Sequence, residues 1–566
     1  MEDAAAAVDK GAEAVCAREA NPLGRRVRQA AFAAPFIAVA ASLVGQLTFG
    51  RAVIWTPDSF GFMQTGFMMA AGADAAGDLE RNAGYPLVAA LLLPLGGLRA
   101  MVTFQSLLAV AGLAALLFCV KAIVRNPFCF GVVGLLTVIA ALANDSFILY
   151  AQTINGDSLF GSLLTLSLAL FLLAWLRSGE TRAISMIGAF GLSYAAYLVK
   201  PNAILTLPLC GACLVFILGR APQLLLKPRL LIALAVLVAA VAGLEFRQAQ
   251  LRYKNEDFGP RTMFCFHLDS VLPDLGGATP QRRQLRSLLE TVRHGSPDWL
   301  ALGYNGDGCF YDQQVHDAIH DNAVSEGMTD KAWLSHRTML ALLHHPGPYF
   351  IQTARQMAFF MRRPIPDASQ PAAGHMDDSS WQSLTPYERF VRMPRIEFER
   401  TLDSWFVQRH GRLSKLGKGL LALLPRSLFP ITFLAGMMAA ADVARRRPAR
   451  RTSVVFLAAT GFVLATALTV ALSHTFDVAR YASSFALLSI FWWLAGLAHL
   501  TAVARDHVRT DLHVRSDGVA LSVRIPALAR ITRPRAVASR DNRRRPEAIK
   551  ANGYAERPLG PFRSSM

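Results

Sequence analysis

The 566-residue chain is 53% hydrophobic and only 17% charged, and its mean hydropathy is +0.32. A soluble globular protein of this length would carry more charge and shorter apolar runs. The formal net charge of +18 suggests nucleic acid only for a soluble protein, and no basic stretch carries the interleaved aromatic residues of a base-stacking surface. Lys and Arg collecting in cytoplasmic loops explain the charge better, so we expect a membrane protein with no nucleic-acid partner.

Apolar runs of about 17–25 residues, each long enough to cross about 30 Å of hydrocarbon, recur along the chain. The first follows a polar, alanine-rich start and is too long for a cleavable signal peptide, so it predicts a signal anchor. The run Tyr85–Leu98 is short and rich in Pro and Gly, which favours an interfacial or half-inserted helix. The sequence therefore predicts an all-α, polytopic transmembrane bundle of about ten spans, near residues 30–49, 101–120, 128–145, 158–176, 183–199, 202–219, 229–245, 427–443, 453–472 and 484–503.

Basic residues decide the expected orientation. Under a ten-span count every strongly basic short connection falls on one side of the membrane, which is the positive-inside pattern with both termini in the cytoplasm. The clusters precede the first span, follow the second and separate the fourth from the fifth, the sixth from the seventh and the eighth from the ninth; they include Arg25, Arg26, Arg28, Lys121, Arg125, Arg177, Arg182, Arg220, Lys227, Arg229, Arg445, Arg446, Arg447, Arg450 and Arg451.

This topology divides the chain into five parts. A cytoplasmic segment (1–29) precedes a first bundle of about seven spans (30–245), which contains an outer loop (50–100). The long polar loop 246–426 predicts a mostly helical exoplasmic domain, in which His344–Pro364 has the pattern of an amphipathic helix lying on the membrane. Three spans (427–503) and a disordered basic cytoplasmic tail (504–566) complete the prediction.

Cysteine usage is consistent with these sides. Only Cys265 and Cys309 fall in the long outer loop, on the oxidising side of the membrane. A bridge between them would stabilise the fold by about 4 kcal/mol in the chain-entropy model; two free, buried thiols are the alternative. No Cys/His spacing resembles a zinc site, so no metal ligands are expected.

Polar residues at the outer ends of spans are the candidates for chemistry. They come from separate stretches of sequence, yet the topology places them at one level. Carboxylates facing cations could remove a proton from an acceptor hydroxyl and stabilise a leaving phosphate. Each residue alone is equally explained as a helix cap or a depth anchor, but the shared level of Asp58, Lys200 and Arg480 favours a site. The full set is Asp58, Ser59, Asp145, Asp157, Lys200, His474, Asp477, Arg480 and Tyr481.

Several of these stretches resemble membrane glycosyltransferases of the GT-C type, within the family of protein O-mannosyltransferases and the lipid A aminoarabinose transferase. "PDSFGFM" followed by "RNAGYPLVAALLLPL" is similar to the family's first outer loop, which has an acidic residue after the first span and a "GYP" segment. "NGDSLFGSLL", "LVKPNAILTLPL" and "DVARYASSF" resemble later segments of that family. The resemblance covers residues 30–220 and, more weakly, the last two spans.

The resemblance implies an inverting transfer of a sugar from a polyprenyl-phosphate carrier to a lipid, glycan or protein acceptor at the outer face of a bacterial inner membrane. Asp58 would be the general base, Asp157 a second carboxylate, and Lys200 and Arg480 the phosphate contacts. The chain departs from the family at Ser59, Asp157 and Lys200, where Glu, Glu and Arg are usual, and Lys lacks the bidentate fork of Arg. A divalent cation is left open as a cofactor; further substrate contacts would be Tyr85, His474, Asp477 and Tyr481.

Three other functions fit parts of the pattern. A transporter or flippase for lipid-linked or anionic solutes would show midplane charges and a repeat, and seven spans before the loop against three after it give no repeat. An O-antigen ligase or polymerase would use residues of the long loop such as His344 and His345 in place of Asp58. A non-catalytic envelope assembly protein is the remaining alternative.

Overall fold

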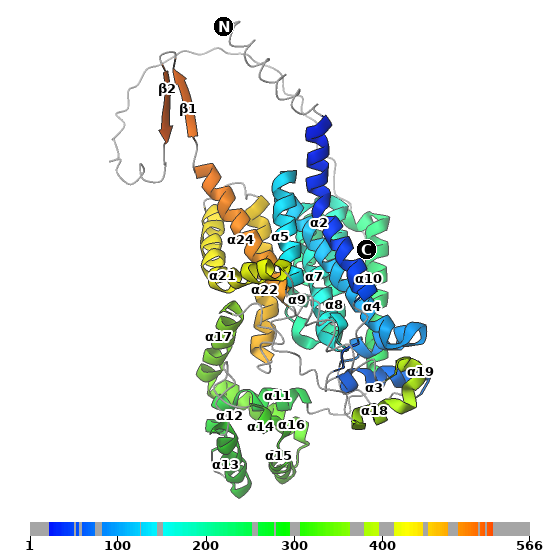
Figure 1. The fold of residues 1–566 in the computed structure, drawn as a ribbon. Helices are drawn as coiled ribbons and strands as arrows, with labels where there is room; N and C mark the ends of the chain where they lie inside the picture. Colours follow the sequence, from blue (N-terminus) through cyan, green and yellow to red (C-terminus); the bar gives the residue numbers. More distant parts are fainter. Residues whose placement is uncertain are drawn as a thin grey trace, which may run out of the picture. The chain divides into compact units, whose positions relative to one another are not determined.

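The computed structural model describes fifteen stretches of the chain: residues 22–49, 53–55, 59–73, 82–124, 126–143, 151–251, 258–276, 279–294, 306–362, 378–394, 412–444, 451–473, 485–507, 510–515 and 518–523. It divides into two compact units, Met1–Val503 and Ala504–Met566, each taken by itself below. Within the described residues of the first unit, every element of regular secondary structure is a helix (Figure 1), apart from one isolated bridge between Ile54 and Thr153.

Nine helical segments within these stretches are long and apolar enough to cross a membrane, which makes the protein a multi-pass helical membrane protein. They coincide with nine of the ten predicted spans. The tenth, 128–145, corresponds to α5 (Pro127–Ala143), an apolar helix of 17 residues. The nine are α2 (Pro22–Phe49), α4 (Gly84–Ile123), α7 (Gly156–Leu176), α8 (Gly179–Val199), η1 with α9 (Pro201–Ala203 and Thr206–Arg220), α10 (Pro228–Gln250), α21 (Arg412–Ala444), α22 (Arg451–Ser473) and α24 (Ala486–His507).

Helix α7 lies at the centre of the bundle core, packed against α4, α8 and α22. Helix α10 is peripheral and contacts α8 and the short η2 (Pro222–Leu226). The core of the bundle is a large apolar cluster, and most of the polar side chains buried within it are uncharged hydroxyls and amides. The few buried charges in this core are therefore informative.

Helix α4 contains two arms, since Gly96 and Gly97 leave the helical conformation between them. Gly97 has φ +65°, and a Cβ there would lie 2.5 Å from the carbonyl oxygen of Phe390, so only glycine fits. The first arm contains the run predicted as a separate interfacial helix. Phe390 belongs to α19 (Glu388–Val391), which packs on α4 at this break; α18 (Asp378–Leu384) and η3 (Thr385–Tyr387) precede α19 in the chain.

The stretch 50–100, predicted as an outer loop, contains a helix that the hydropathy pattern did not separate, α3 (Ser59–Ala70). Its apolar side chains pack on α4, and the Phe67 ring stacks on Tyr387 with centroids 5.0 Å apart. Twelve residues are too few to span a bilayer, so this helix is held by packing against its neighbours.

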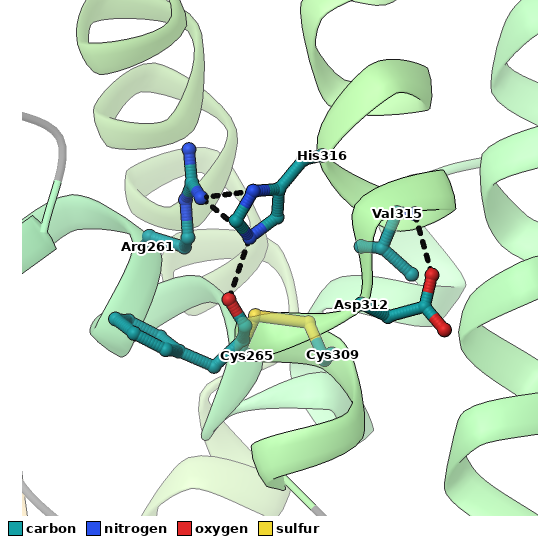
Figure 2. Close-up of a disulfide and its surroundings, with 7 residues drawn as sticks. Arg261, Cys265, Cys309, Asp312, Val315 and His316 are labelled. Atoms are coloured by element: carbon teal, nitrogen blue, oxygen red, sulfur yellow. Dashed lines mark hydrogen bonds between the residues drawn. A yellow bond between two sulfur atoms is a disulfide. The ribbon is translucent and has the colours of Figure 1, made fainter. Parts of the chain in front are cut away.

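The predicted helical domain in the long loop is confirmed as helical, and we call residues 258–344 the loop domain. It has its own core around Trp333, Phe264 and Ile319. Cys265 and Cys309 form a disulfide in this core, with 5.5 Å between their Cα atoms (Figure 2), as the sequence suggested. Its helices are α11 (Phe258–Cys265), α12 (Leu268–Asp274), α13 (Pro280–His294), α14 (Gly306–Tyr311), α15 (Gln313–Ser325) and α16 (Asp330–His344); α17 (Pro346–Arg362) follows and packs on α12, α21 and α22.

The second unit contains an antiparallel hairpin, β1 (Thr510–Arg515) with β2 (Gly518–Val523), in which Arg515 pairs with Gly518. This differs from the expectation of a tail without regular structure after residue 504. The reason is local: Leu512 and Val514 alternate with polar residues, which is the pattern of a strand. Residues 524–566 lie outside the described part of the chain.

Candidate functional site

Two of the predicted site residues meet in the bundle. Asp157 lies in the first turn of α7, and Lys200 follows the last residue of α8. The Lys200 ammonium forms an ion pair with Oδ1 of Asp157, and the two side chains are only 9% and 1% exposed. The two residues are 43 positions apart, and the chain between them runs out along α7 and back along α8, so the contact is decided by the hairpin of two spans.

Glycines allow the three helices around this pair to approach closely. A Cβ on Gly156 would lie 3.1 Å from the Phe62 ring and 3.4 Å from Cε of Lys200. A Cβ on Gly84 would lie 2.5 Å from the backbone of Leu198. Asn155 caps α7 by accepting the N–H of Asp157 at 3.0 Å, which fixes the start of the helix.

Tyr85 lies beside the pair and holds the segment that leads to it. Its hydroxyl donates to Oε1 of Gln105 at 2.7 Å, and its ring packs edge-on against Phe62 with centroids 5.4 Å apart. Nε2 of Gln105 donates in turn to the carbonyl of Thr153 at 2.9 Å. Tyr85, predicted as a substrate contact, therefore positions residues 151–155 in this structure.

The chain before Asp58 runs alongside the chain before Asp157. Ile54 donates its N–H to the carbonyl of Gln152 at 3.0 Å and accepts from the N–H of Ile154 at 2.9 Å, in a parallel bridge. Ser59, directly after Asp58, is fully buried at the start of α3. The described residues before Asp58 thus border the segment that carries Asp157. The other predicted site residues, Asp58 among them, lie outside the described residues: Asp58, Asp145, His474, Asp477, Arg480 and Tyr481.

Two buried amides near the pair were not predicted. Gln152 is fully buried, and among the described residues neither atom of its amide group has a hydrogen-bond partner; the same holds for Nδ2 of the buried Asn202. An unpaired buried amide costs about 1–3 kcal/mol, and such groups often await a ligand or an ordered water. Both residues stand in the polar stretches that contain Asp157 and Lys200, which was the only signal that the sequence offered.

His344 and His345, the residues favoured by a ligase function, stand where the loop domain ends: His344 is the last residue of α16, and His345 is its C-cap. Nδ1 of His344 contacts Oδ1 of Asp274 at 2.7 Å, and its side chain is 58% exposed. His345 is half-buried. Neither reaches a buried polar site, and within the described stretches no three His, Cys, Asp or Glu residues form a group that could hold a metal ion.

The fold and the ion pair together define the structural class: the protein is a multi-pass helical membrane protein with a charged, polar centre at one end of its bundle. No family model matches the chain, and neither does any curated protein or solved structure. The function is therefore argued below from the chemistry of the site and from the sequence motifs that contain it.

Proposed function

We propose that this protein is an integral membrane glycosyltransferase, which moves a sugar from a polyprenyl-phosphate carrier to an acceptor at the outer face of a bacterial inner membrane. The observation that carries the proposal is the buried contact between Asp157 and Lys200. Both residues lie in segments that resemble GT-C enzymes, and the sequence pattern predicts both as site residues.

The energetic cost of the pair supports a functional role. Moving two charges out of water costs several kcal/mol per ion, and apolar residues of similar volume often give equal or greater stability. Charged side chains inside membrane bundles are accordingly rare and commonly mark substrate paths. The neighbouring unpaired amides of Gln152 and Asn202 raise the cost further, which is consistent with a centre arranged to receive a polar substrate.

The proposed reaction is a single displacement at the anomeric carbon. The acceptor hydroxyl oxygen forms the new bond to this carbon while the bond to the phosphate oxygen breaks, and the anomeric configuration is inverted. The hydroxyl proton passes to a carboxylate, for which Asp58 is the candidate base. The polyprenyl phosphate leaves with its bonding electron pair and needs a cation beside it.

Lys200 is the candidate for that cation. An ammonium carries three N–H donors, so it can contact a carboxylate and a phosphate together. Asp157 would orient the ammonium and so act as a positioning residue, a narrower role than that of an independent second carboxylate. Arg480 remains the candidate for a second phosphate contact through its motif, and the substrate side of the site would be completed by the segment 474–481.

The test compares single and double variants at the pair. Asp157→Asn with Lys200→Met removes both charges and hence the cost of an unpaired buried ion. If the pair served stability alone, this double variant would support normal glycan modification in the host. We expect normal membrane levels but loss of the modification by at least about 100-fold, as for other removed transition-state contacts, measured by mass spectrometry of surface glycans.

Asp58→Asn provides the second arm, with Asp317→Asn as the control, because Asp317 is an exposed carboxylate of the loop domain. Loss of modification in Asp58→Asn but not in Asp317→Asn supports the catalytic role. Unchanged surface glycans in both the Asp58 variant and the double variant would disprove the proposal. If the protein were a transporter, cells with an inactive variant would instead accumulate the lipid-linked solute on the cytoplasmic side of the membrane. Analysis of the polyprenyl-linked carrier distinguishes the two functions.

A further inference from the structure

A pocket of about 290 Å³ lies between the loop domain and α17. This volume is at the lower end of the range for small-molecule sites, so it suits one headgroup or monosaccharide better than a lipid chain. The pocket is lined by Asp269 of α12, Arg293 of α13, and Pro348, Ile351, Gln352 and Arg355 of α17.

The pocket carries a net positive charge. Arg293 forms an ion pair with Asp269 at 2.6 Å. Arg355 is exposed and has no ion-pair or hydrogen-bond partner in the described part of the chain. Two guanidinium groups therefore face one carboxylate, and guanidinium groups stay charged at any physiological pH. A ligand with one anionic group and several hydroxyl groups matches this set, because the arginines can bind the anionic group and the Asp269 carboxylate can accept hydrogen bonds from the hydroxyls.

The base of the pocket is fixed by buried contacts. Gln352 donates from Nε2 to the carbonyl of Phe266, and its Oε1 lies 3.3 Å from Nδ1 of His267. Burial lowers the pKa of His267 to about 4, so this ring is neutral at physiological pH. The Tyr349 ring packs edge-on against it, with centroids 4.8 Å apart. The helix that carries Arg355 is thereby held against the loop domain, while Ile351 supplies an apolar wall.

Specific contacts connect this pocket to the end of the bundle that holds the ion pair. The Tyr349 hydroxyl donates to the carbonyl of Leu472 at 3.4 Å. One turn earlier on α22, Oγ1 of Thr469 accepts from the N–H of Leu205 at 3.3 Å, and three residues of helix advance by only about 4.5 Å. Leu205 belongs to the turn that follows Lys200. The pocket and the pair thus lie at the same end of the bundle.

We infer that this pocket binds the anionic headgroup of the acceptor: a sugar that bears a phosphate or a carboxylate group. Arg355 and Arg293 contact the anionic group, and Asp269 accepts from the sugar hydroxyls. The role of this ligand as the acceptor rests on the proposed glycosyltransferase function, whereas the binding of an anionic sugar to the pocket does not. The position at the same bundle end as Lys200 would hold the acceptor beside the leaving phosphate.

The test measures binding to the purified full-length protein in nanodiscs of neutral lipid. The probes are glucose 6-phosphate and glucuronate, with glucose and inorganic phosphate as comparisons. Isothermal titration calorimetry measures the binding of each. We expect one anionic sugar to bind at least tenfold more tightly than glucose, and Arg355→Ala to weaken it about tenfold, which corresponds to one charge-assisted hydrogen bond. Arg355→Lys should lose part of the affinity, because Lys keeps the charge without the fork.

Arg286→Ala is the matched control, since Arg286 lies on α13 and pairs with Glu290 at the surface. Equal binding of glucose and both anionic sugars, or unchanged binding in Arg355→Ala, would overturn the inference. Inorganic phosphate binding as tightly as glucose 6-phosphate would overturn the sugar part of it. The Asp157→Asn, Lys200→Met double variant should bind the anionic sugar normally while losing glycan modification, so the pocket and the proposed transfer can fail independently.

Discussion

The charged residues at the end of the bundle and those inside the loop domain show two uses of the same interaction. Asp157 and Lys200 are almost fully removed from solvent and lie among apolar spans. Glu326 of the loop domain keeps a side-chain exposure of 20% and contacts two arginines, Arg282 and Arg337. The first arrangement costs free energy that apolar residues would not, whereas the second joins three surface-accessible helices. Burial, and not pairing alone, therefore separates a candidate site from a structural network.

The largest expected effect tests this difference directly. Lys200→Met alone removes the ammonium from a buried carboxylate and should destabilise the protein by about 3–5 kcal/mol. Adding Asp157→Asn should recover most of the lost stability, because no buried ion then remains at this site. Thermal unfolding of the purified protein measures both. Equal stability of the single and double variants would show that the pair is far less dry than its 9% and 1% exposures indicate.

The loop domain should instead depend on its disulfide. Replacing Cys265 and Cys309 by serine opens a link across a sequence separation of 44 residues and should cost about 4 kcal/mol in the chain-entropy model. Limited proteolysis should then cut within 258–344 before it cuts the spans. Cys129→Ser, at an exposed free thiol, is the control. Cleavage of the spans at the same rate as the loop domain would contradict two independently stabilised regions.

Acid should weaken the loop domain in two steps. Burial raises the pKa of the Glu326 carboxyl, but hydrogen bonds from Trp333, Arg337 and Arg282 outweigh it and lower the pKa from 4.5 to about 2. His267, held neutral by burial, has its pKa lowered from 6.5 to about 4. In both cases the unfolded chain binds the proton more readily, so stability falls as pH falls.

The windows distinguish the two groups. The contribution of His267 to stability should disappear between pH 6.5 and 4, and its loss should be seen where α17 contacts the loop domain. The contribution of Glu326 should disappear between pH 4.5 and 2. Hydrogen exchange followed against pH measures each step. Glu326→Gln should cost about 2 kcal/mol at neutral pH and remove the lower step, whereas Glu290→Gln, at an exposed pair, should leave it. A lower step that survives in Glu326→Gln would assign it to another group.

The smallest expected effect concerns the junction of α4 with the helices of residues 378–391. Gly97→Ala introduces a Cβ 2.5 Å from a carbonyl oxygen, at backbone angles that are close to glycine-only, which should cost about 1–3 kcal/mol and loosen α19 locally. Gly243→Ala, in the peripheral α10 with nothing within 4 Å of its Cβ position, should cost nothing. Equal thermal stability of both variants would show that α19 does not depend on the break in α4.

Hydropathy was sufficient to place most of the helices. A run of about 20 apolar residues has one stable form in a bilayer, because every backbone group must be bonded within the segment. The predicted spans therefore coincide with observed helices, and α5 is the one that is shorter than the rest. Packing was needed to reveal α3, whose 12 residues form a helix against α4 that no hydropathy window separates.

For the site, the sequence by itself determined which residue types stand at the ends of spans, and so selected Asp157 and Lys200. Only the tertiary structure decided that they touch, because the contact depends on glycine-mediated packing of α4, α7 and α8. It also decided that Gln152 and Asn202 are buried and that Arg293 and Arg355 share a pocket. Periodicity reports the burial of single residues along a helix, whereas contacts between side chains distant in sequence depend on how the helices assemble.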